Sequence, residues 1–134
     1  MKKVAVLLAD GFEEIEALTV VDILRRASVY VDTVSITDEY KVRGSHGINV
    51  QTEDLFDEVN FVEFDMIVLP GGMPGTTNLD EHPGVKRVVE DYDIRQICSC
   101  NLCSAKHSWR YGTVKGKTCG MLSVGRRQTV RRSD

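Results

Sequence analysis

The first 92 residues predict an α/β fold, a doubly wound parallel sheet with helices on its faces. Two observations support this prediction. Short continuous apolar runs alternate with segments of helical periodicity, and glycine-containing loops follow the two most apolar runs. Residues 93–134 do not continue this pattern. We therefore expect residues 1–92 to be the N-terminal part of one domain and residues 93–134 to be an aberrant, poorly ordered tail, so that the C-terminal part of the fold is incomplete.

The first elements are a strand, a helix and a second strand. Residues 4–8 form the continuous apolar run expected of a strand that is buried on both faces of a parallel sheet. Residues 10–12 turn the chain. Apolar residues then recur at helical spacing, at Ile15, Leu18, Val21, Leu24 and Ala27. Residues 30–36 alternate in polarity as a second strand does.

A hairpin, a third buried strand and a second helix follow. Residues 40–43 and 48–50 flank Gly44-Ser45-His46-Gly47, which indicates a β-hairpin. Residues 64–69 form the next buried strand, and it ends at the glycine-rich loop 70–75. The last predicted helix runs from about residue 82 to residue 92. Pro83 lies in its first turn, and its inward positions are Val85, Val88 and Val89.

Two loops at the carboxyl ends of predicted strands form the candidate site. Ligands of doubly wound sheets gather at these ends, so residues 10–16 and residues 70–72 are expected to lie together. Their glycines let the backbone approach a ligand closely and direct N–H groups at an anion. Each loop by itself is an ordinary turn signal.

The composition argues against export and against a membrane partner. The apolar run at residues 4–9 is interrupted by Asp10, and no run approaches the ~20 residues that span a bilayer. The expected location is cytoplasmic, where the four cysteines would stay reduced.

Three segments, taken together, resemble the ThiJ/PfpI superfamily, which is class I glutamine amidotransferase-like. They are VLLADGFEEIE at residues 6–16, GSHGI at 44–48 and DMIVLPGGMPG at 65–75. The resemblance covers residues 1 to about 92 and implies a flavodoxin-like sandwich that is a homodimer in intact relatives. It also implies cysteine-dependent chemistry, because members include glyoxalase- or deglycase-type enzymes, peptidase-related proteins and redox-responsive chaperones.

The resemblance assigns roles to three residues. Glu16 matches a partly buried acid held beside a cysteine thiolate, and burial keeps such an acid protonated so that it donates a hydrogen bond to sulfur. The amide of Gly72 matches an oxyanion donor, and Gly71 and Gly72 match the substrate-binding loop. Without the resemblance, Glu16 would be read as a charge on a helix surface. The implied partner is a small carbonyl substrate, with no cofactor and no metal.

The charge balance changes near Asp93. Residues 1–92 hold 8 Lys/Arg against 18 Asp/Glu and no cysteine, whereas residues 93–134 hold 9 against 2 and all four cysteines. The family places its nucleophile in an Ala-Ile-Cys-Ala-Ala-Pro-like elbow shortly after the second helix. Here the chain reads DIRQICSCNLCSAK from residue 93, in which we find neither a buried strand nor such an elbow.

A shift of reading frame explains this departure. Back-translation with one nucleotide removed inside the codon for Ile94 permits a continuation that contains Ile-Cys-Ala-Ala-Pro. The cysteine codon of that frame straddles Leu102 and Cys103, so the nucleophile position falls at Leu102. We therefore expect this chain to be inactive. The encoding DNA tests the hypothesis, and an uninterrupted frame with no restorable elbow would refute it.

Other interpretations remain open. A non-enzymatic, redox-responsive chaperone or stress protein needs the same fold but no turnover. Three cysteines of the tail with His107 or Cys119 could form a Cys₃His zinc site, although the spacing C-x-C-x-x-C at Cys98, Cys100 and Cys103 is not that of paired knuckles.

Three further residue patterns have an ordinary explanation. The basic run at residues 126–132 could bind nucleic acid, but the acidic body would repel phosphate, so no nucleic-acid partner is expected. Cys103 is next to the nucleophile position, but an offset of one residue on an elbow turns the side chain away. His46 is interpreted as a turn-stabilising residue near a dimer contact and not as a catalytic base.

Overall fold

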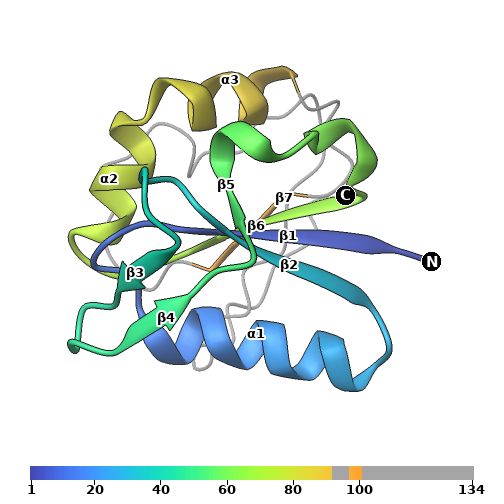
Figure 1. Cartoon of the computed structure of the whole chain (residues 1–134), viewed down its shortest axis with the longest axis horizontal. Coiled ribbons are helices and arrows are strands. Elements are labelled where there is room, and N and C mark those ends of the chain that lie inside the picture. The colour runs from blue at the N-terminus through green and yellow to red at the C-terminus, as the bar shows by residue number, and fades with distance from the viewer. Residues whose placement is uncertain (92–96, 101–134) are drawn as a thin grey trace, which may run out of the picture.

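The computed structural model describes residues 1–91 and 97–100, and a parallel sheet forms the centre of this part of the chain (Figure 1). The strands lie in the order β5-β2-β1-β6-β7. Their bounds are Lys3–Leu8 for β1, Tyr30–Ser35 for β2, Asp54–Leu55 for β5, Met66–Pro70 for β6 and Ile97–Cys100 for β7. The predicted doubly wound α/β fold is therefore confirmed.

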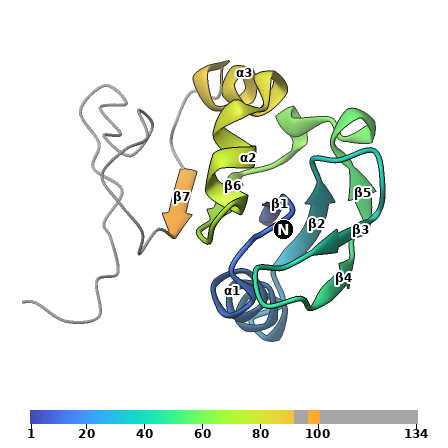
Figure 2. The same cartoon turned by 90° about the vertical axis from the view of Figure 1, so that its left-hand side faces the viewer.

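The central strand β1 is apolar on both faces because helices cover both. Val4, Val6 and Leu8 share a core with helix α1, Glu14–Arg26. The alternate residues of β1 pack instead on the side of α2, Gly75–Glu81, and α3, Pro83–Asp91. Figure 2 shows the sheet between these two layers.

Helix α1 buries a face that differs from the predicted one at both ends, since Ile15 is exposed and Ala27 is an exposed residue just after the helix. Val21 and Leu24 face the sheet as expected, but Ile15 is 75% exposed. Ala17 takes the buried position in the first turns instead. Residues two positions apart point in directions about 200° apart on a helix, so Ala17 and Ile15 cannot both face the core.

The predicted hairpin is confirmed. Strands β3, Lys41–Arg43, and β4, Asn49–Gln51, pair antiparallel as a separate two-stranded sheet. Val42 is fully buried in the core on the α1 side, so the hairpin is packed onto the domain by its central residue.

Several short elements were not predicted. They are β5, α2 and two 3-10 turns, η1 at Phe56–Glu58 and η2 at Phe61–Glu63. The segment that forms α2, GTTNLDE, has a single large apolar residue, Leu79, and it is fully buried. A helix with one apolar contact shows no periodicity in its sequence, which explains the omission.

Strand β7 corrects the expectation that the tail supplies no strand. Residues 97–100 pair in parallel with β6, with Ile97 opposite Ile67 and Cys100 opposite Pro70. The pairing uses backbone N–H and C=O groups, which any residue except proline supplies, so the exposed edge of β6 can recruit a segment that lacks an apolar pattern. The domain boundary at residue 92 and the poor order of the rest of the tail remain predictions.

In the part of the chain that the structure describes, no helix has the length and apolar character needed to cross a bilayer.

Replacement of the fully buried Leu7 by alanine should destabilise the domain strongly, because it leaves a cavity beneath the sheet. We expect the free energy of unfolding to fall by about 2–5 kcal/mol. Urea denaturation followed by circular dichroism measures the change. Ile23→Ala is the matched control, because Ile23 is 58% exposed and its loss should change stability by no more than about 0.5 kcal/mol. Equal effects of the two substitutions would contradict the assigned core.

Candidate functional site

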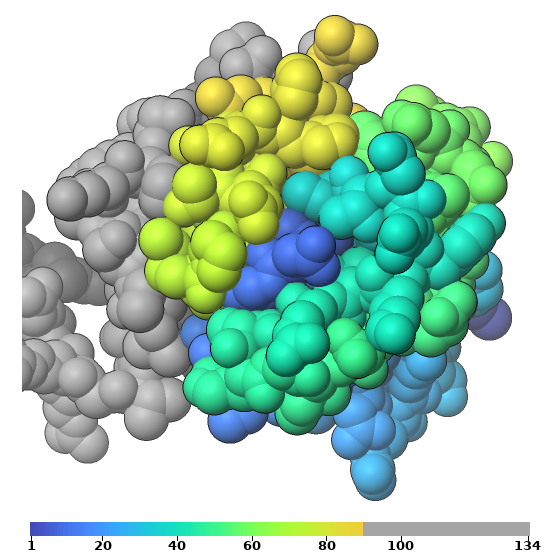
Figure 3. Space-filling model, turned by 60° about the vertical axis from the view of Figure 1, so that its left-hand side comes forward, coloured from blue at the N-terminus to red at the C-terminus, as the bar shows by residue number. Residues whose placement is uncertain are grey.

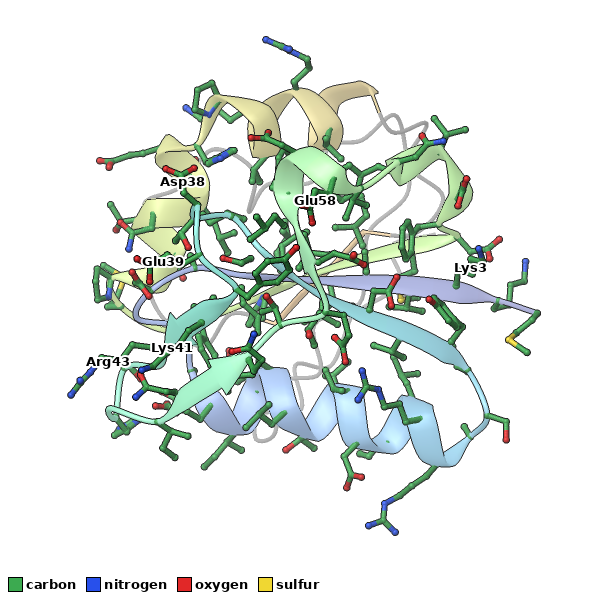
Figure 4. The ribbon with its side chains drawn as sticks, in the orientation of Figure 1. Lys3, Asp38, Glu39, Lys41, Arg43 and Glu58 are labelled. Carbon is green, nitrogen blue, oxygen red and sulfur yellow. The ribbon has the colours of Figure 1, made fainter. Side chains whose placement is uncertain are left out.

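Three loops meet at the carboxyl ends of β1 and β6. They are residues 9–13, residues 71–74 and the hairpin turn 44–48. Figure 3 shows N-terminal residues, in blue, reaching the surface between the hairpin and the α2 segment. Figure 4 places Lys41 and Arg43 of the hairpin at this end of the molecule and Lys3 at the opposite end of the sheet.

The first two loops are joined backbone to backbone. The amide of Glu13 donates to the carbonyl oxygen of Gly71 at 2.8 Å, and the amide of Gly75 donates to that of Gly11 at 3.2 Å. The predicted neighbourhood of residues 10–16 and 70–72 is therefore present in the structure.

Two glycines make this approach possible. Gly11 and Gly72 have φ angles of +85° and +103°, a region that other residues rarely adopt. A Cβ atom on Gly72 would collide with the backbone nitrogen of Glu13, and one on Gly11 would collide with Pro74. Glycine is thus required at both positions by conformation and by space.

Glu16 lies in the first turn of α1 and reaches across to the loop after β6. Its Oε2 accepts a hydrogen bond from the amide of Gly71 at 2.7 Å. Burial raises the pKa of Glu16, the charge of Glu13 raises it further, and the Gly71 amide acts in the opposite direction. The net effect is a pKa of Glu16 above its ordinary value, which is the direction that the resemblance implies for this acid.

The backbone amides of the two loop glycines differ in whether they already donate a hydrogen bond. The amide of Gly71 is used by Glu16. Within residues 1–91 and 97–100, the amide of Gly72 donates to no acceptor. Gly72 therefore offers an available donor at the candidate site, whereas Gly71 contributes by fixing the acid.

The remaining predicted site residue, Leu102, lies outside the described residues. Strand β7 ends at Cys100, opposite Pro70, which directly precedes Gly71. The structure therefore brings together Glu16, Gly71 and Gly72 but does not describe the nucleophile position. Cys103 also lies outside the described residues. The same holds for the residues after β7 that the zinc-site and nucleic-acid interpretations involve.

A second group of polar residues was missed from the sequence. Glu14, only 4% exposed, is held under the hairpin turn. Its Oε1 accepts hydrogen bonds from the amides of His46 at 2.8 Å and Ile48 at 3.4 Å, while its Oε2 lies 3.0 Å from Nδ1 of His46. Burial raises the pKa of Glu14, but the His46 ring and these amides outweigh it and bring the pKa to about 2.

The position of His46 agrees with its interpretation as a turn-stabilising residue. Its hydrogen bond to Glu14 raises the pKa of His46, and the charges of Glu13 and Glu14 add to the effect. The proposed dimer contact at His46 stays a prediction. The glycine at position 44 is the residue in the sequence that reflects this group, because a Cβ atom there would overlap the Glu14 carboxylate.

Among the described residues, potential metal ligands converge at Glu13, Glu14 and His46, whose ligand atoms lie within 4.8 Å of one another. This group is separate from Glu16, which is bonded to the loop after β6.

Comparison with known proteins agrees with this fold. A solved DJ-1 superfamily protein of Salmonella typhimurium is 40% identical, with a TM-score of 0.69 over 75% of this chain and 55% of its own. Oxidized DJ-1 of Toxoplasma gondii is 32% identical, with a TM-score of 0.70 over 77% of this chain and 56% of its own.

Curated relatives extend beyond this chain. The Parkinson disease protein 7 homolog of Danio rerio is 30% identical over 84% of this chain and 62% of its own length. A deglycase of Thermococcus kodakarensis is 39% identical over 72% of this chain and 60% of its own. The chain spans only 24% of Protein DJ-1 homolog B of Arabidopsis thaliana.

The family model described as DJ-1/PfpI matches residues 2–127, which includes most of the segment after Asp93. Together with the glycine-joined loops and the acid on the first turn of α1, this match shows that the chain belongs to the DJ-1/PfpI family.

Proposed function

We propose that the chain carries the acid and the oxyanion donor of a cysteine-dependent enzyme that acts on small reactive carbonyl compounds. The chemistry is of the deglycase or glyoxalase type, and this form is inactive because Leu102 stands at the nucleophile position. The main support is the bond between Gly71 and Glu16, since it fixes a carboxyl group whose pKa is raised at the end of two parallel strands. The relative named as a deglycase supports the substrate class.

The two oxygens of Glu16 would have different tasks. Oε2 accepts the Gly71 amide, so the proton of the neutral acid belongs on Oε1 and is free to be donated. A hydrogen bond from that proton stabilises a thiolate, which is the form of cysteine that attacks a carbonyl carbon. The Gly72 amide would then bind the oxygen that becomes negative, a contribution typically worth ~3 kcal/mol.

Two observations bear on the state of the tail. The match of the family model to residue 127 counts against a tail that is unrelated to the family. Strand β7 likewise shows that residues 97–100 still add to the sheet. The proposal of inactivity therefore depends on the elbow after β7 and not on the loss of the whole C-terminal part. Sequencing of the encoding DNA decides whether a frameshift put Leu102 there.

Two wider features complete the proposal. We expect a homodimer, as the resemblance implies for intact relatives, and the exposed Ile15 and Ile48, at 75% and 52%, offer apolar surface for such a contact. We also expect the protein to act in the cytoplasm.

A turnover assay with methylglyoxal tests the proposed chemistry. We compare this chain with a version whose residues from 93 onward follow the restored frame. The restored version should consume methylglyoxal, and this chain should not exceed buffer. Cys103→Ser in this chain should change nothing. Turnover by this chain that is lost in Cys103→Ser would refute inactivity, and absence of turnover in both versions would favour the non-enzymatic chaperone.

In the restored version, Glu16→Leu should lower kcat by roughly 100-fold, because leucine fills the space but donates no proton. Glu63→Leu is the matched control, since the Glu63 side chain is 60% exposed and lies near the opposite end of the sheet. Equal activities of the Glu16 and Glu63 variants would contradict the role of Glu16.

The raised pKa of Glu16 also predicts a pH dependence of stability. A carboxyl group whose pKa is higher in the folded state binds protons more tightly there, so its contribution is present at low pH and lost as pH rises through the folded pKa. Glu16→Gln, which cannot ionise, should therefore gain stability relative to the wild type as pH rises from the acid range toward neutrality. Urea denaturation at several pH values measures this difference, and a constant difference would contradict the assignment.

A further inference from the structure

The hairpin turn and the start of α1 bring together the donor atoms of a metal site. Nδ1 of His46 lies 3.0 Å from Oε2 of Glu14 and 3.3 Å from Oε1 of Glu13. The hydroxyl of Ser45 lies 3.2 Å from Oε2 of Glu14 and 3.5 Å from Oε2 of Glu13. We propose that Glu13, Glu14 and His46 bind a divalent transition-metal ion of the zinc type.

The two separations from Nδ1 of His46 fit a coordination polyhedron, and all three ligand atoms lie within 4.8 Å of one another. Ligand atoms about 2.0–2.2 Å from a zinc ion lie about 3.3–3.6 Å apart at tetrahedral angles and about 2.8–3.1 Å apart at octahedral angles. The two distances from Nδ1 fall at these values. We therefore expect an ion to take the place of the proton between the imidazole and the carboxylates.

Backbone hydrogen bonds, in addition to those of the Glu14 side chain, hold the two elements together. The amide of Gly11 donates to the carbonyl of Arg43, and the amide of Ser45 donates to that of Phe12, both at 2.8 Å. These bonds hold His46 over the first turn of α1 whether or not an ion is bound. A site assembled in this way loses little conformational entropy when the metal enters.

Glu14 has the outer support that metal ligands usually have. Amides of His46 and Ile48 occupy Oε1 and leave Oε2 directed at the imidazole. Such partners fix the orientation of a ligating group. The absence of a side chain at Gly44 leaves the space that the carboxylate fills.

The ligand types favour zinc over the hard cations. One imidazole and two carboxylates suit Zn²⁺, whereas Mg²⁺ and Ca²⁺ prefer oxygen ligands alone. The His46 side chain is 68% exposed, so water can complete the coordination and the ion can enter from solvent. The inference does not depend on the proposed catalytic function, because Glu16 is not among the ligands.

Calorimetric titration with Zn²⁺ alone tests the site. The full chain is used with Cys98, Cys100, Cys103 and Cys119 replaced by serine, so that thiols cannot bind the ion. The wild-type chain with alkylated thiols is measured beside it. We expect saturable binding of one Zn²⁺ per chain and none of Mg²⁺ at the same concentrations. Absence of saturable Zn²⁺ binding in both proteins would overturn the proposal and leave an ordinary ion pair between His46 and the two carboxylates.

Variants in the cysteine-free chain then locate the ion. His46→Gln and Glu13→Gln should each weaken Zn²⁺ binding by roughly 10–100-fold or more, since even outer-shell changes have effects of that size. The matched control is His82→Asn, because His82 caps α3 through a 3.1 Å bond from the amide of Val85 and asparagine can keep that cap. Circular dichroism without metal confirms the fold of each variant. Unchanged affinity in folded His46→Gln or Glu13→Gln, or an equal loss in His82→Asn, would overturn the assignment.

Discussion

The backbone contact between the loop after β1 and the loop after β6 is the constraint on which the rest of the site depends. Two hydrogen bonds join these loops, and no side chain could intervene at Gly11 or Gly72 without a collision. The contact places the first turn of α1 against the amide of Gly71, so Glu16 needs no further support to reach it. The same junction leaves the Gly72 amide without an acceptor among the described residues, which is the arrangement that an oxyanion requires.

Much of the fold follows from local patterns. The runs at β1 and β6 were predicted because strands buried on both faces must be apolar throughout. The role of Glu16 followed from the resemblance. Helical periodicity alone predicts a charged side chain on the helix surface at this position. Glu14 could not be identified as buried, because its partners belong to a turn 32 residues along the chain. Helix α2 was not predicted, because a segment with one large apolar residue, Leu79, shows no helical periodicity of apolar residues.

For residues 97–100 of the tail, composition alone predicted the wrong local structure. Its basic charge and clustered cysteines suggested a segment foreign to the sheet, yet residues 97–100 pair with β6 in parallel. Strand pairing is specified chiefly by backbone groups and an available edge, and both are present whatever the reading frame. Nucleophile elbows are different, since they need small residues and a particular side chain at one position. The proposed loss of the cysteine at Leu102 is thus compatible with a sheet that continues past residue 92.

The first turn of α1 holds two glutamates, Glu14 and Glu16, whose surroundings differ sharply. Glu14 is surrounded by N–H donors, and its pKa is about 2, whereas burial raises that of Glu16 only two positions later. The start of α1 therefore places two carboxyl groups of opposite tendency two residues apart: compared with an ordinary glutamate, Glu14 favours its charged form and Glu16 its neutral form.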